Sequence, residues 1–365
     1  MDTTLQAMVE RVRAAAASAT PLCIRGGSTK DFYGEPIAGE ALDTTPLAGI
    51  VSYEPSELVV TVRTGTPLAE LEALLAGKGQ CLAFEPPRFG GGTVGGMVAA
   101  GLSGPSRASV GSVRDHVLGA ELLNGKAELL RFGGTVMKNV AGYDVSRVLA
   151  GSLGTLGVIT EVSLKVLPVP PAEATLRFDC SQADALRLLN SWGGQPLPLN
   201  ASCWVEDAGN PVLYLRLRGA VAAVEAACAH LGGERQENVA ADWDACRDQT
   251  LPWFVDTPAT HDLWRVSVPQ TAPVLAIAGE PPLIEWHGAQ RWYRIPSGQG
   301  GAIRAAARAA GGHATLFRPG DASRSDARFD TLSPALARVQ HNLMHEFDPH
   351  RIFNRGRLGN EGKAW

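Results

Sequence analysis

Three glycine-rich segments are the part of this sequence most suited to holding a ligand. They cover residues 26–27, 90–104 and 151–157, and sixteen of the 41 glycines fall between Gly90 and Gly157. Gly26-Gly27-Ser28-Thr29 directly follows a predicted strand, so its backbone N–H groups could form a concave nest for phosphate. Together the segments indicate a large phosphorylated cofactor bound in extended form. Ordinary turns of a β-rich domain are the alternative.

The residues from Gly90 to Gly95 match the letters of the G-x-G-x-x-G pattern found in nicotinamide dinucleotide sites. The preceding Glu85-Pro86-Pro87-Arg88 cannot form the buried strand that this pattern requires, and no βαβ unit surrounds it. A Rossmann nicotinamide site is therefore disfavoured.

The cysteine and histidine residues of this sequence do not indicate a metal site or an iron-sulfur cluster. The six cysteines are scattered without a Cys-x-x-Cys pair, which excludes a self-contained iron-sulfur cluster or zinc knuckle and indicates reduced, mostly buried thiols. His341 and His345 have the spacing of two ligands on one helical turn, but nearby residues complete no recognised ligand set. We predict no metal site.

Length and composition narrow the class of protein further. A chain of 365 residues with 45% apolar content favours two domains with their own cores. A formal net charge of -4 gives no basic field for nucleic acid. No stretch reads as a membrane span or a signal peptide, so we expect a cytoplasmic location.

The first region predicts an α+β domain with mixed or antiparallel strands. We expect helices at 4–17, with Thr3 or Thr4 as cap, and from Thr66 to Gly77. Val117–Leu123 and Ala127–Phe132 predict a hairpin closed by a tight Asn124-Gly125 turn. The other predicted elements are strands 22–24, 49–53, 58–63 and 158–166, and a helix from Asp144 to Leu149.

The second region alternates strands and helices, as in a sheet with helices on one face. Leu167-Pro168-Val169-Pro170-Pro171 reads as a stiff crossover between the two regions. A last helix begins at Ser333-Pro334 and carries an apolar stripe that includes Leu336 and Val339. The expected domains are residues 1–168, 172–330 and 331–365, the last packing back on the first.

Four motifs, in order, resemble the FAD-binding domain of the vanillyl-alcohol oxidase superfamily, over about residues 20–168. They are Ile24–Thr29, Gly92–Ala99, Val113–Gly119 and Gly151–Glu161. Val136–Val145 and Gly311–Arg318 are similar to the family of FAD-binding subunits of bacterial glycolate oxidases. The ending with Phe347-Asp348-Pro349, Ile352-Phe353-Asn354 and Gly356-Arg357 is similar to the C-terminal signature of FAD-linked oxidases, with Arg355 where proline is usual.

The resemblance implies a fold and a set of cofactor contacts. The fold is α+β, a PCMH-type FAD-binding domain of two α+β subdomains followed by a smaller α/β cap domain with an antiparallel sheet. Arg25 to Lys30 would wrap the pyrophosphate. A histidine that often bonds covalently to the flavin is replaced by Ser28, so non-covalent FAD is expected. The implied cofactor-binding residues are Arg25, Gly26, Gly27, Ser28, Thr29, Lys30, Thr93, Val94, Gly95, Gly96, Ser103, Gly104, Gly154, Thr155, Gly157, Val158 and Ile159.

Candidates for catalysis are fewer. An oxidase of 2-hydroxy acids needs a cation for the carboxylate and a base near the hydroxyl. His313 and Arg318 lie on one predicted strand, although strict alternation places them on opposite faces, and His313 could be a structural histidine. Lys138 and Asn139 could face the flavin or brace a turn. No His-x-Gly-Asp-Gly-Asn motif of the larger hydroxy-acid oxidases occurs.

The resemblance implies a role within a complex. The predicted function is that of an FAD-binding subunit of a glycolate oxidase, working with a larger FAD-linked subunit and an iron-sulfur subunit on glycolate or a similar acid. Contact with the inner membrane would come only through the complex. A structural subunit without turnover and a solitary flavin reductase of the same fold are the alternatives. Trp286, Arg291 and Trp292 could anchor a partner, or belong to the core.

Overall fold

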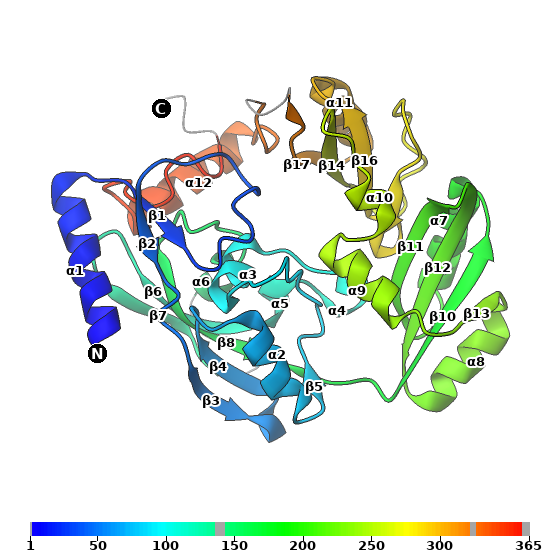
Figure 1. Ribbon diagram of the computed structural model, residues 1–365, viewed down its shortest axis with the longest axis horizontal. Helices are drawn as coiled ribbons and strands as arrows, with labels where there is room; N and C mark the ends of the chain where they lie inside the picture. Colours follow the sequence, from blue (N-terminus) through cyan, green and yellow to red (C-terminus); the bar gives the residue numbers. More distant parts are fainter. Residues whose placement is uncertain (1, 136–142, 322–325, 360–365) are drawn as a thin grey trace. The chain divides into compact units, whose positions relative to one another are not determined.

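The computed structural model describes residues 2–135, 143–321 and 326–359, and the chain divides into two compact units (Figure 1). The first unit contains the chain up to Leu102, residues Ser112–Pro168 and the chain from Thr331. The second contains Ser103–Gly111 and Val169–Asp330. The chain thus changes unit after Pro168 and after Asp330, and it also leaves and re-enters the first unit around segment 103–111.

A five-stranded antiparallel sheet is the larger sheet of the first unit, with strand order β3-β4-β8-β6-β7. Its central strand is buried on both faces, because six of its eight residues are buried. The strands are β3 (Ile50–Glu54), β4 (Val59–Arg63), β6 (Val117–Leu123), β7 (Leu129–Gly133) and β8 (Val158–Lys165). The predicted strands of this region are therefore present, with the 3-10 turn η1 (Pro55–Glu57) between β3 and β4.

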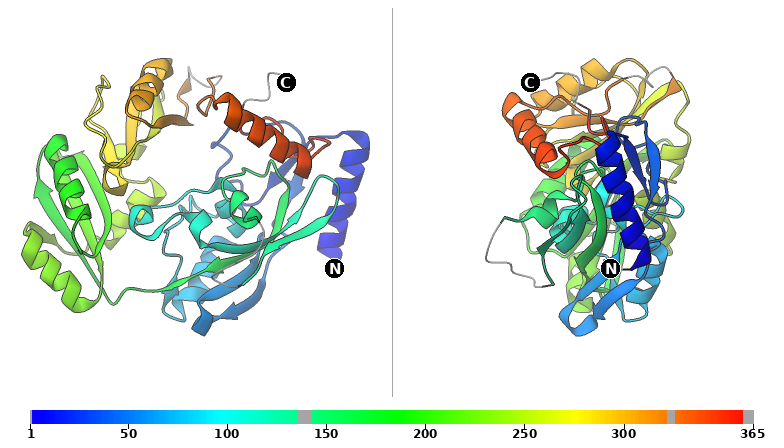
Figure 2. Two further views of the ribbon diagram at one scale, coloured as in Figure 1. Left: turned by 180° about the vertical axis from the view of Figure 1, so that it is seen from behind. Right: turned by 90° about the vertical axis from the view of Figure 1, so that its left-hand side faces the viewer.

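A smaller parallel pair, β1 (Leu22–Arg25) and β2 (Glu40–Asp43), forms the second part of this unit beside α1 (Thr3–Ser18) (Figures 1 and 2). Val12 of α1 and Leu22 of β1 share a core with Phe353 from the far end of the chain. The N-cap of α1 is Asp2, whose side chain accepts a hydrogen bond from the N–H of Leu5. The predicted cap at Thr3 or Thr4 is wrong because the helix starts one residue earlier.

The hairpin of β6 and β7 exists, but its turn differs from the prediction. Leu123 pairs with Leu129, so the loop has five residues and no two-residue primed turn forms. The Asn124 carboxamide oxygen accepts from the N–H groups of Lys126 and Glu128, and Ala127 takes the left-handed conformation with φ 58°. Gly125 instead permits a close approach, since a Cβ there would lie 2.3 Å from an oxygen of Asp348.

Short helices connect the strands of the first unit. The Asp144 side chain caps α6, as predicted, by accepting from the N–H of Arg147. The other elements are α2 (Leu68–Ala76), β5 (Gln80–Cys81), α3 (Val94–Ala100), α5 (Val113–His116), α6 (Val145–Val148), β9 (Leu167–Pro168) and α12 (Pro334–Phe347). Lys138 and Asn139 lie outside the described residues.

Helix α12 begins at the predicted cap Ser333, but its apolar stripe does not face a core. Leu336 is 59% exposed and Val339 is 64% exposed. Only Phe347, at the last turn, is buried. The prediction that this stripe packs is therefore wrong for its first half, since periodicity shows that one face is apolar but not what covers it.

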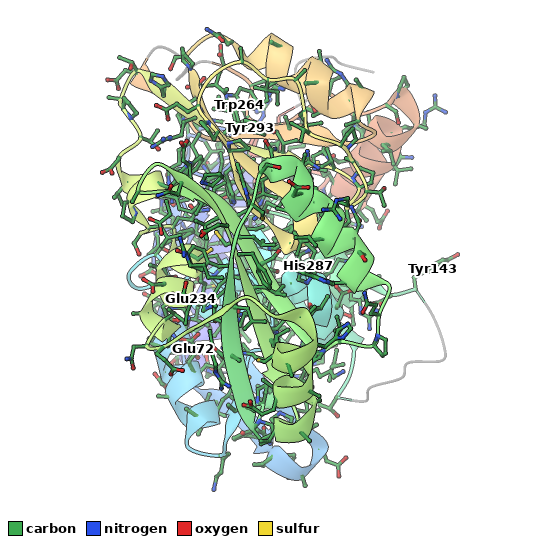
Figure 3. The ribbon with its side chains drawn as sticks, turned by 90° about the vertical axis from the view of Figure 1, so that its right-hand side faces the viewer. Glu72, Tyr143, Glu234, Trp264, His287 and Tyr293 are labelled. Atoms are coloured by element: carbon green, nitrogen blue, oxygen red, sulfur yellow. The ribbon has the colours of Figure 1, made fainter. Side chains whose placement is uncertain are left out.

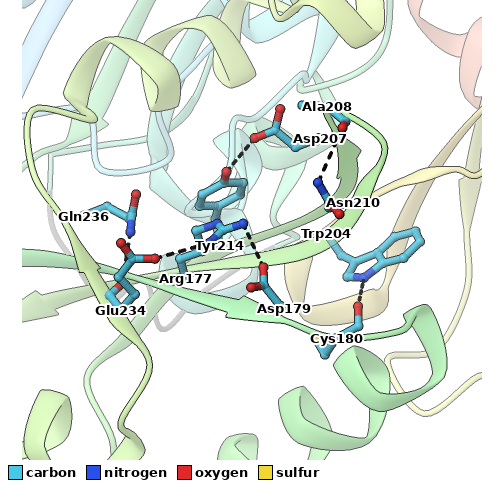
Figure 4. Close-up of polar contacts among 10 residues, drawn as sticks. All are labelled: Arg177, Asp179, Cys180, Trp204, Asp207, Ala208, Asn210, Tyr214, Glu234 and Gln236. Atoms are coloured by element: carbon cyan, nitrogen blue, oxygen red, sulfur yellow. Dashed lines mark hydrogen bonds and ion pairs between the residues drawn. The ribbon is translucent and has the colours of Figure 1, made fainter.

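An eight-stranded antiparallel sheet forms the centre of the second unit, with strand order β13-β10-β12-β11-β15-β16-β14-β17. This confirms the predicted antiparallel sheet of the cap. Its strands are β10 (Ala172–Asp179), β11 (Leu199–Asp207), β12 (Asn210–Gly219), β13 (Glu234–Gln236), β14 (His261–Ser267), β15 (Leu283–Glu285), β16 (Gln290–Pro296) and β17 (His313–Arg318). An ion pair of Arg177 with Glu234 joins β10 to the edge strand β13, and Arg177 also pairs with Asp179 on its own strand (Figure 4).

Helices cover both faces of this sheet, so the prediction of helices on one face is only partly right. Leu189 and Val224, from α7 and α8, pack on Leu215, and Ile303 of α11 packs against Trp264 and Tyr293, which pair on β14 and β16 (Figure 3). On the other face the indole of Trp243 donates to the hydroxyl of Thr175. The helices are α4 (Arg107–Val110), α7 (Gln182–Gly193), α8 (Val221–Leu231), α9 (Ala240–Asp248), α10 (Pro252–Val255) and α11 (Gly300–Ala309), with the 3-10 turn η2 (Trp286–Gly288).

Two of the three proposed partner anchors belong to the core. Arg291 is fully buried, and its guanidinium donates to the carbonyl oxygens of Ala272, Pro273 and Gly288. Trp292 is 3% exposed and donates to Glu285. Of the two readings that the sequence left open for these side chains, the core reading therefore holds for Arg291 and Trp292, because their polar groups bond inside the second unit. Among the described residues, no helix combines the length and apolar character needed to cross a bilayer.

Candidate functional site

A cavity of about 270 Å³ lies in the first unit and collects most of the predicted cofactor-binding residues. Its walls come from the loop after β1, from α3, from the loop before β8 and from the chain after α12. The predicted residues that line it are Arg25, Gly26, Gly27, Ser28, Thr29, Lys30, Thr93, Gly95, Gly96, Gly154, Gly157 and Ile159. Segments more than 300 residues apart in the sequence therefore form one concave site.

The loop after β1 presents unbonded backbone donors to this cavity. Ser28 takes a left-handed conformation with φ 53°, which turns successive N–H groups toward one side. In the described part of the chain, the N–H groups of Gly27, Ser28 and Thr29 have no protein acceptor. A Cβ on Gly27 would lie 2.2 Å from the carbonyl oxygen of Gly91, so this glycine is needed for the loops to touch. The loop has the form of an anion nest.

Cationic side chains give the same wall a positive character. Lys30 places its Nζ 5.6 Å from the centre of the Phe89 ring and 3.4 Å from the Thr29 hydroxyl. The Arg25 guanidinium lies 3.7 Å from a carboxylate oxygen of Asp31, and both side chains are about half exposed. Two cations against one carboxylate leave a net positive wall, which suits a phosphate-bearing ligand.

The opposite wall is set by close packing between α3 and the central sheet. Thr93 caps α3 by accepting from the N–H of Gly96 at 3.2 Å. A Cβ on Gly95 would lie 2.7 Å from the side chain of Thr64. The Thr64 hydroxyl in turn donates to the carbonyl of Ile159. These contacts hold the start of α3 against β8 at the floor of the cavity.

The tail after α12 supplies two lining residues, Asn354 and Arg357, that the prediction omitted. The Asn354 carboxamide accepts from the N–H of Ile24 at 2.8 Å and donates to the carbonyl of Leu153 at 2.7 Å. Arg357 donates to the carbonyls of Lys30, Asp31 and Glu35 and so fixes the loop after β1. The C-terminal signature was the signal that could have identified them.

The other predicted residues lie away from the cavity wall. Val94 and Val158 are fully buried, and Thr155 donates its hydroxyl to the carbonyl of Ser152. Ser103 and Gly104 belong to the second unit, where the Gly104 carbonyl accepts from the Trp286 indole at 2.9 Å. These side chains support the walls of the first unit or hold segment 103–111.

The structure places the two candidate catalytic residues at opposite ends of β17. Ser267 pairs with His313 and Leu263 pairs with Arg318. Five residues of strand separate them by about 16 Å, too far for joint contact with one small acid. Partial desolvation and the Arg265 cation lower the pKa of His313, and burial lowers the pKa of Arg318 to about 10. Arg318 still carries a positive charge at neutral pH.

The cavity fits part of an extended dinucleotide. Unbonded N–H donors at residues 27–29 and cations at Arg25 and Lys30 meet the needs of a pyrophosphate. The size of about 270 Å³ is at or below the usual range of about 300–1,000 Å³ for sites that enclose a whole ligand. Residues 25–30 are therefore suited to the central phosphates.

Comparisons with known proteins agree with this reading. A family model described as an FAD binding domain matches residues 3–133. Glycolate oxidase subunit GlcE of Escherichia coli (strain K12) is 46% identical over 354 residues, which are 97% of this chain and 97% of that protein. Glycolate oxidase subunit GlcD of Bacillus subtilis (strain 168) is 32% identical over 127 residues, 35% of this chain and 27% of that protein.

The fold also has relatives among solved structures. A structure of alkyldihydroxyacetonephosphate synthase matches with a TM-score of 0.64 and 17% identity, over 95% of this chain and 74% of that one. At this identity the match supports the fold alone.

The family model and the cavity define an FAD-binding protein, and the glycolate oxidase relatives place it among the FAD-dependent oxidoreductases. Within that class, the chain belongs to the family of the glycolate oxidase subunit GlcE.

Proposed function

We propose that this chain is the FAD-binding subunit of a multi-subunit glycolate oxidase that oxidises glycolate to glyoxylate and passes electrons to an iron-sulfur partner. The observation that carries the proposal is the 46% identity to a glycolate oxidase subunit over 97% of both chains. The phosphate-binding character of the cavity supports a cofactor role for this chain rather than a purely structural one.

The cofactor would be held without a covalent bond. Residues 25–30 and Thr93 to Gly96 would contact the phosphates, and Gly154 to Ile159 would contact the adenine side. Ser28 offers no imidazole for attachment to a flavin. Bound FAD supplies an acceptor for the two electrons and the hydrogen that leave an alcohol carbon. The role of this chain would be to hold the cofactor, to orient it and to shield it from solvent.

Arg318 is the residue that we propose to bind the substrate carboxylate. Its guanidinium lies 5.3 Å from the centre of the Phe317 ring, and that of Arg265 lies 5.5 Å from the same ring. Two guanidinium groups around one apolar ring suit a small acid, because a planar cation binds a carboxylate through two hydrogen bonds. His313, at the far end of the strand, would not share this contact.

A partner is needed for electrons to leave. The sequence contains no Cys-x-x-Cys, and its six cysteines are widely spaced. An iron-sulfur subunit would supply the missing carrier, and a larger FAD-linked subunit would supply the His-x-Gly-Asp-Gly-Asn motif that is absent here. The resulting assembly would contain at least three kinds of subunit.

Dye reduction by the assembled complex tests the proposal. The chain is expressed alone and with its presumed partners, and glycolate-dependent reduction of an artificial dye is measured. Activity only in the complex, with an Arg318→Gln variant raising KM at least tenfold and leaving the FAD content unchanged, is expected. Arg338→Gln, an exposed arginine on α12, is the matched control.

Two results would contradict it. Full activity of the chain alone would make it a self-sufficient oxidoreductase. A complex that keeps normal activity when this chain cannot bind FAD would give the chain a structural role.

A further inference from the structure

The 3-10 turn η2 contains three successive residues in the left-handed conformation. Their φ angles are 52° for Trp286, 54° for His287 and 100° for Gly288. Each non-glycine residue in this region is strained, and such strain persists only where surrounding contacts enforce it. The contacts of Trp286 and His287 therefore identify the neighbouring residues that stabilise this strained turn.

Three of these contacts reach one piece of chain, segment 103–111. The Trp286 indole donates to the Gly104 carbonyl at 2.9 Å, and the Arg107 guanidinium lies 4.5 Å from the centre of the Trp286 rings. The Nε2 of His287 lies 3.2 Å from the Ser109 hydroxyl. The turn thus contacts segment 103–111 near both ends and in the middle, within the second unit.

Donor and acceptor roles around His287 fit only a neutral ring. The Ser109 hydroxyl donates to the Asn200 carbonyl at 2.9 Å, so it accepts from Nε2–H of His287. The Ser202 oxygen accepts from the backbone N–H of His287 and donates its hydrogen to Nδ1, at 2.9 and 3.2 Å. Ser202 is fully buried, so a second proton on the ring would leave its hydroxyl without an acceptor.

The charged side chains packed near the turn, Arg107, Arg291 and Glu285, make their contacts with groups other than the His287 ring. Arg107 of α4 stacks on Trp286, and Arg291 of β16 donates to the Gly288 carbonyl. Glu285 of β15 is bonded to Trp292 and Gln290 instead. From α7 and β11 the turn meets the uncharged Leu186 and Ser202. Burial lowers the pKa of His287 to about 4, which agrees with this arrangement.

Segment 103–111 is continuous with the wall of the cofactor cavity. Ala99 and Ala100 at the end of α3 line the cavity, and Ser103 follows three residues later. A Cβ on the intervening Gly101 would lie 2.9 Å from the backbone of Gly151, so α3 ends in a tight contact. Two residues of chain, Gly101 and Leu102, thus join Ser103 to the end of α3.

We propose that His287 (Figure 3) is a positioning residue, which fixes segment 103–111 through Ser109 and thereby fixes the α3 wall of the FAD site. This inference rests on the proposed FAD-binding function. It predicts that the imidazole matters through its Nε2–H rather than through the backbone conformation of the turn.

Three variants separate those two contributions. His287→Asn keeps a residue type that tolerates left-handed φ but is too short to reach Ser109. His287→Gln reaches Ser109 with an amide N–H but is less suited to that φ. Ser109→Ala removes the acceptor alone. His230→Gln, at an exposed histidine of α8 bonded to Gln195, is the control.

Hydrogen exchange and FAD affinity of the holoprotein are measured between pH 7.5 and pH 4. We expect His287→Asn and Ser109→Ala to lower the protection factors of 103–111 at least tenfold and raise the Kd for FAD at least threefold, while His287→Gln retains most of both. In the unmodified protein the same loss should appear as pH approaches 4, and it should be absent from His287→Asn, which has already lost the bond.

Protection in His287→Asn equal to the unmodified protein would overturn the proposal, and so would a loosened segment with unchanged FAD affinity. Failure of the unmodified protein to bind FAD would contradict the proposed function. In that case exchange at 103–111 would still report separately on the contact between His287 and Ser109.

Discussion

Asn354 donates a hydrogen bond of 2.7 Å to the carbonyl of Leu153, across 201 residues of sequence. Its carboxamide oxygen accepts from Ile24, so one side chain joins the strand before the phosphate-binding loop to the loop before β8. A Cβ on Gly154 would lie 2.6 Å from the same amide nitrogen. The C-terminal tail is thus part of the cofactor site.

Asn354→Asp is expected to weaken FAD binding about tenfold. The change replaces the donor to Leu153 with a carboxylate oxygen, and a buried carbonyl left without its donor costs about 1–3 kcal/mol. Fluorescence titration with FAD measures the loss. Asn210→Asp, at the exposed first residue of β12, should leave the affinity unchanged, and equal affinities for all three proteins would remove Asn354 from the site.

Gly27→Ala is expected to destabilise the first unit by about 1–3 kcal/mol and to abolish retention of FAD during purification. A Cβ at this position meets the Gly91 carbonyl oxygen at 2.2 Å, and a backbone atom cannot move aside as a flexible side chain can. Thermal unfolding and the flavin absorbance report the two effects.

Gly193→Ala provides the comparison, since a Cβ there has open space. It lies in the last turn of α7 and should be neutral or slightly stabilising. A normal melting temperature and normal flavin content in Gly27→Ala would show that the two loops do not need their close contact.

Local signals allowed much of the fold to be predicted from the sequence. Asp144 and Ser333 cap helices as expected because capping depends on residues only three positions apart. Strand β11 (Leu199–Asp207) was missed, since its residues follow a proline-containing segment and pair with strands both near and distant in sequence. The two-residue turn predicted at Asn124-Gly125 is wrong, because Gly125 is needed for close packing against Asp348, which is distant in the sequence.

The sequence also predicted part of the cofactor cavity, namely its glycine-rich loops, but not the residues that the C-terminal tail contributes. Glycine segments around Gly26, Gly95 and Gly154 indicated the loops that meet at the cavity. The C-terminal signature marks Asn354 and Arg357, but it does not show which loops, more than 200 residues earlier, they bond to. The exposure of the apolar face of α12 could not be predicted either, because an apolar stripe does not show which residues, if any, cover it.

Asp348→Asn is expected to change the pH dependence of stability. Burial raises the pKa of Asp348 above its ordinary value of 3.8, and one carboxylate oxygen accepts from the N–H of Phe353. A raised pKa means that the folded state binds the proton more tightly than the unfolded state. This carboxyl therefore favours folding below its ordinary pKa, and the contribution is lost as pH rises through the raised value.

The measurement is the melting temperature of both proteins from pH 4 to pH 7.5. The value for Asp348→Asn minus that for the unmodified protein should increase with pH, since the asparagine carries no charge to desolvate. A difference that stays constant or decreases with pH would show that Asp348 is not held in its protonated form by burial.

The flavin content of the purified chain tests the central claim most directly. The protein is purified with FAD present, freed of excess cofactor and precipitated with acid, and flavin is measured in the supernatant and in the pellet. One FAD per chain, recovered in the supernatant and lost in Gly27→Ala, is the predicted result. A chain that takes up no FAD, or a pellet that stays yellow, would contradict non-covalent FAD binding at residues 25–30.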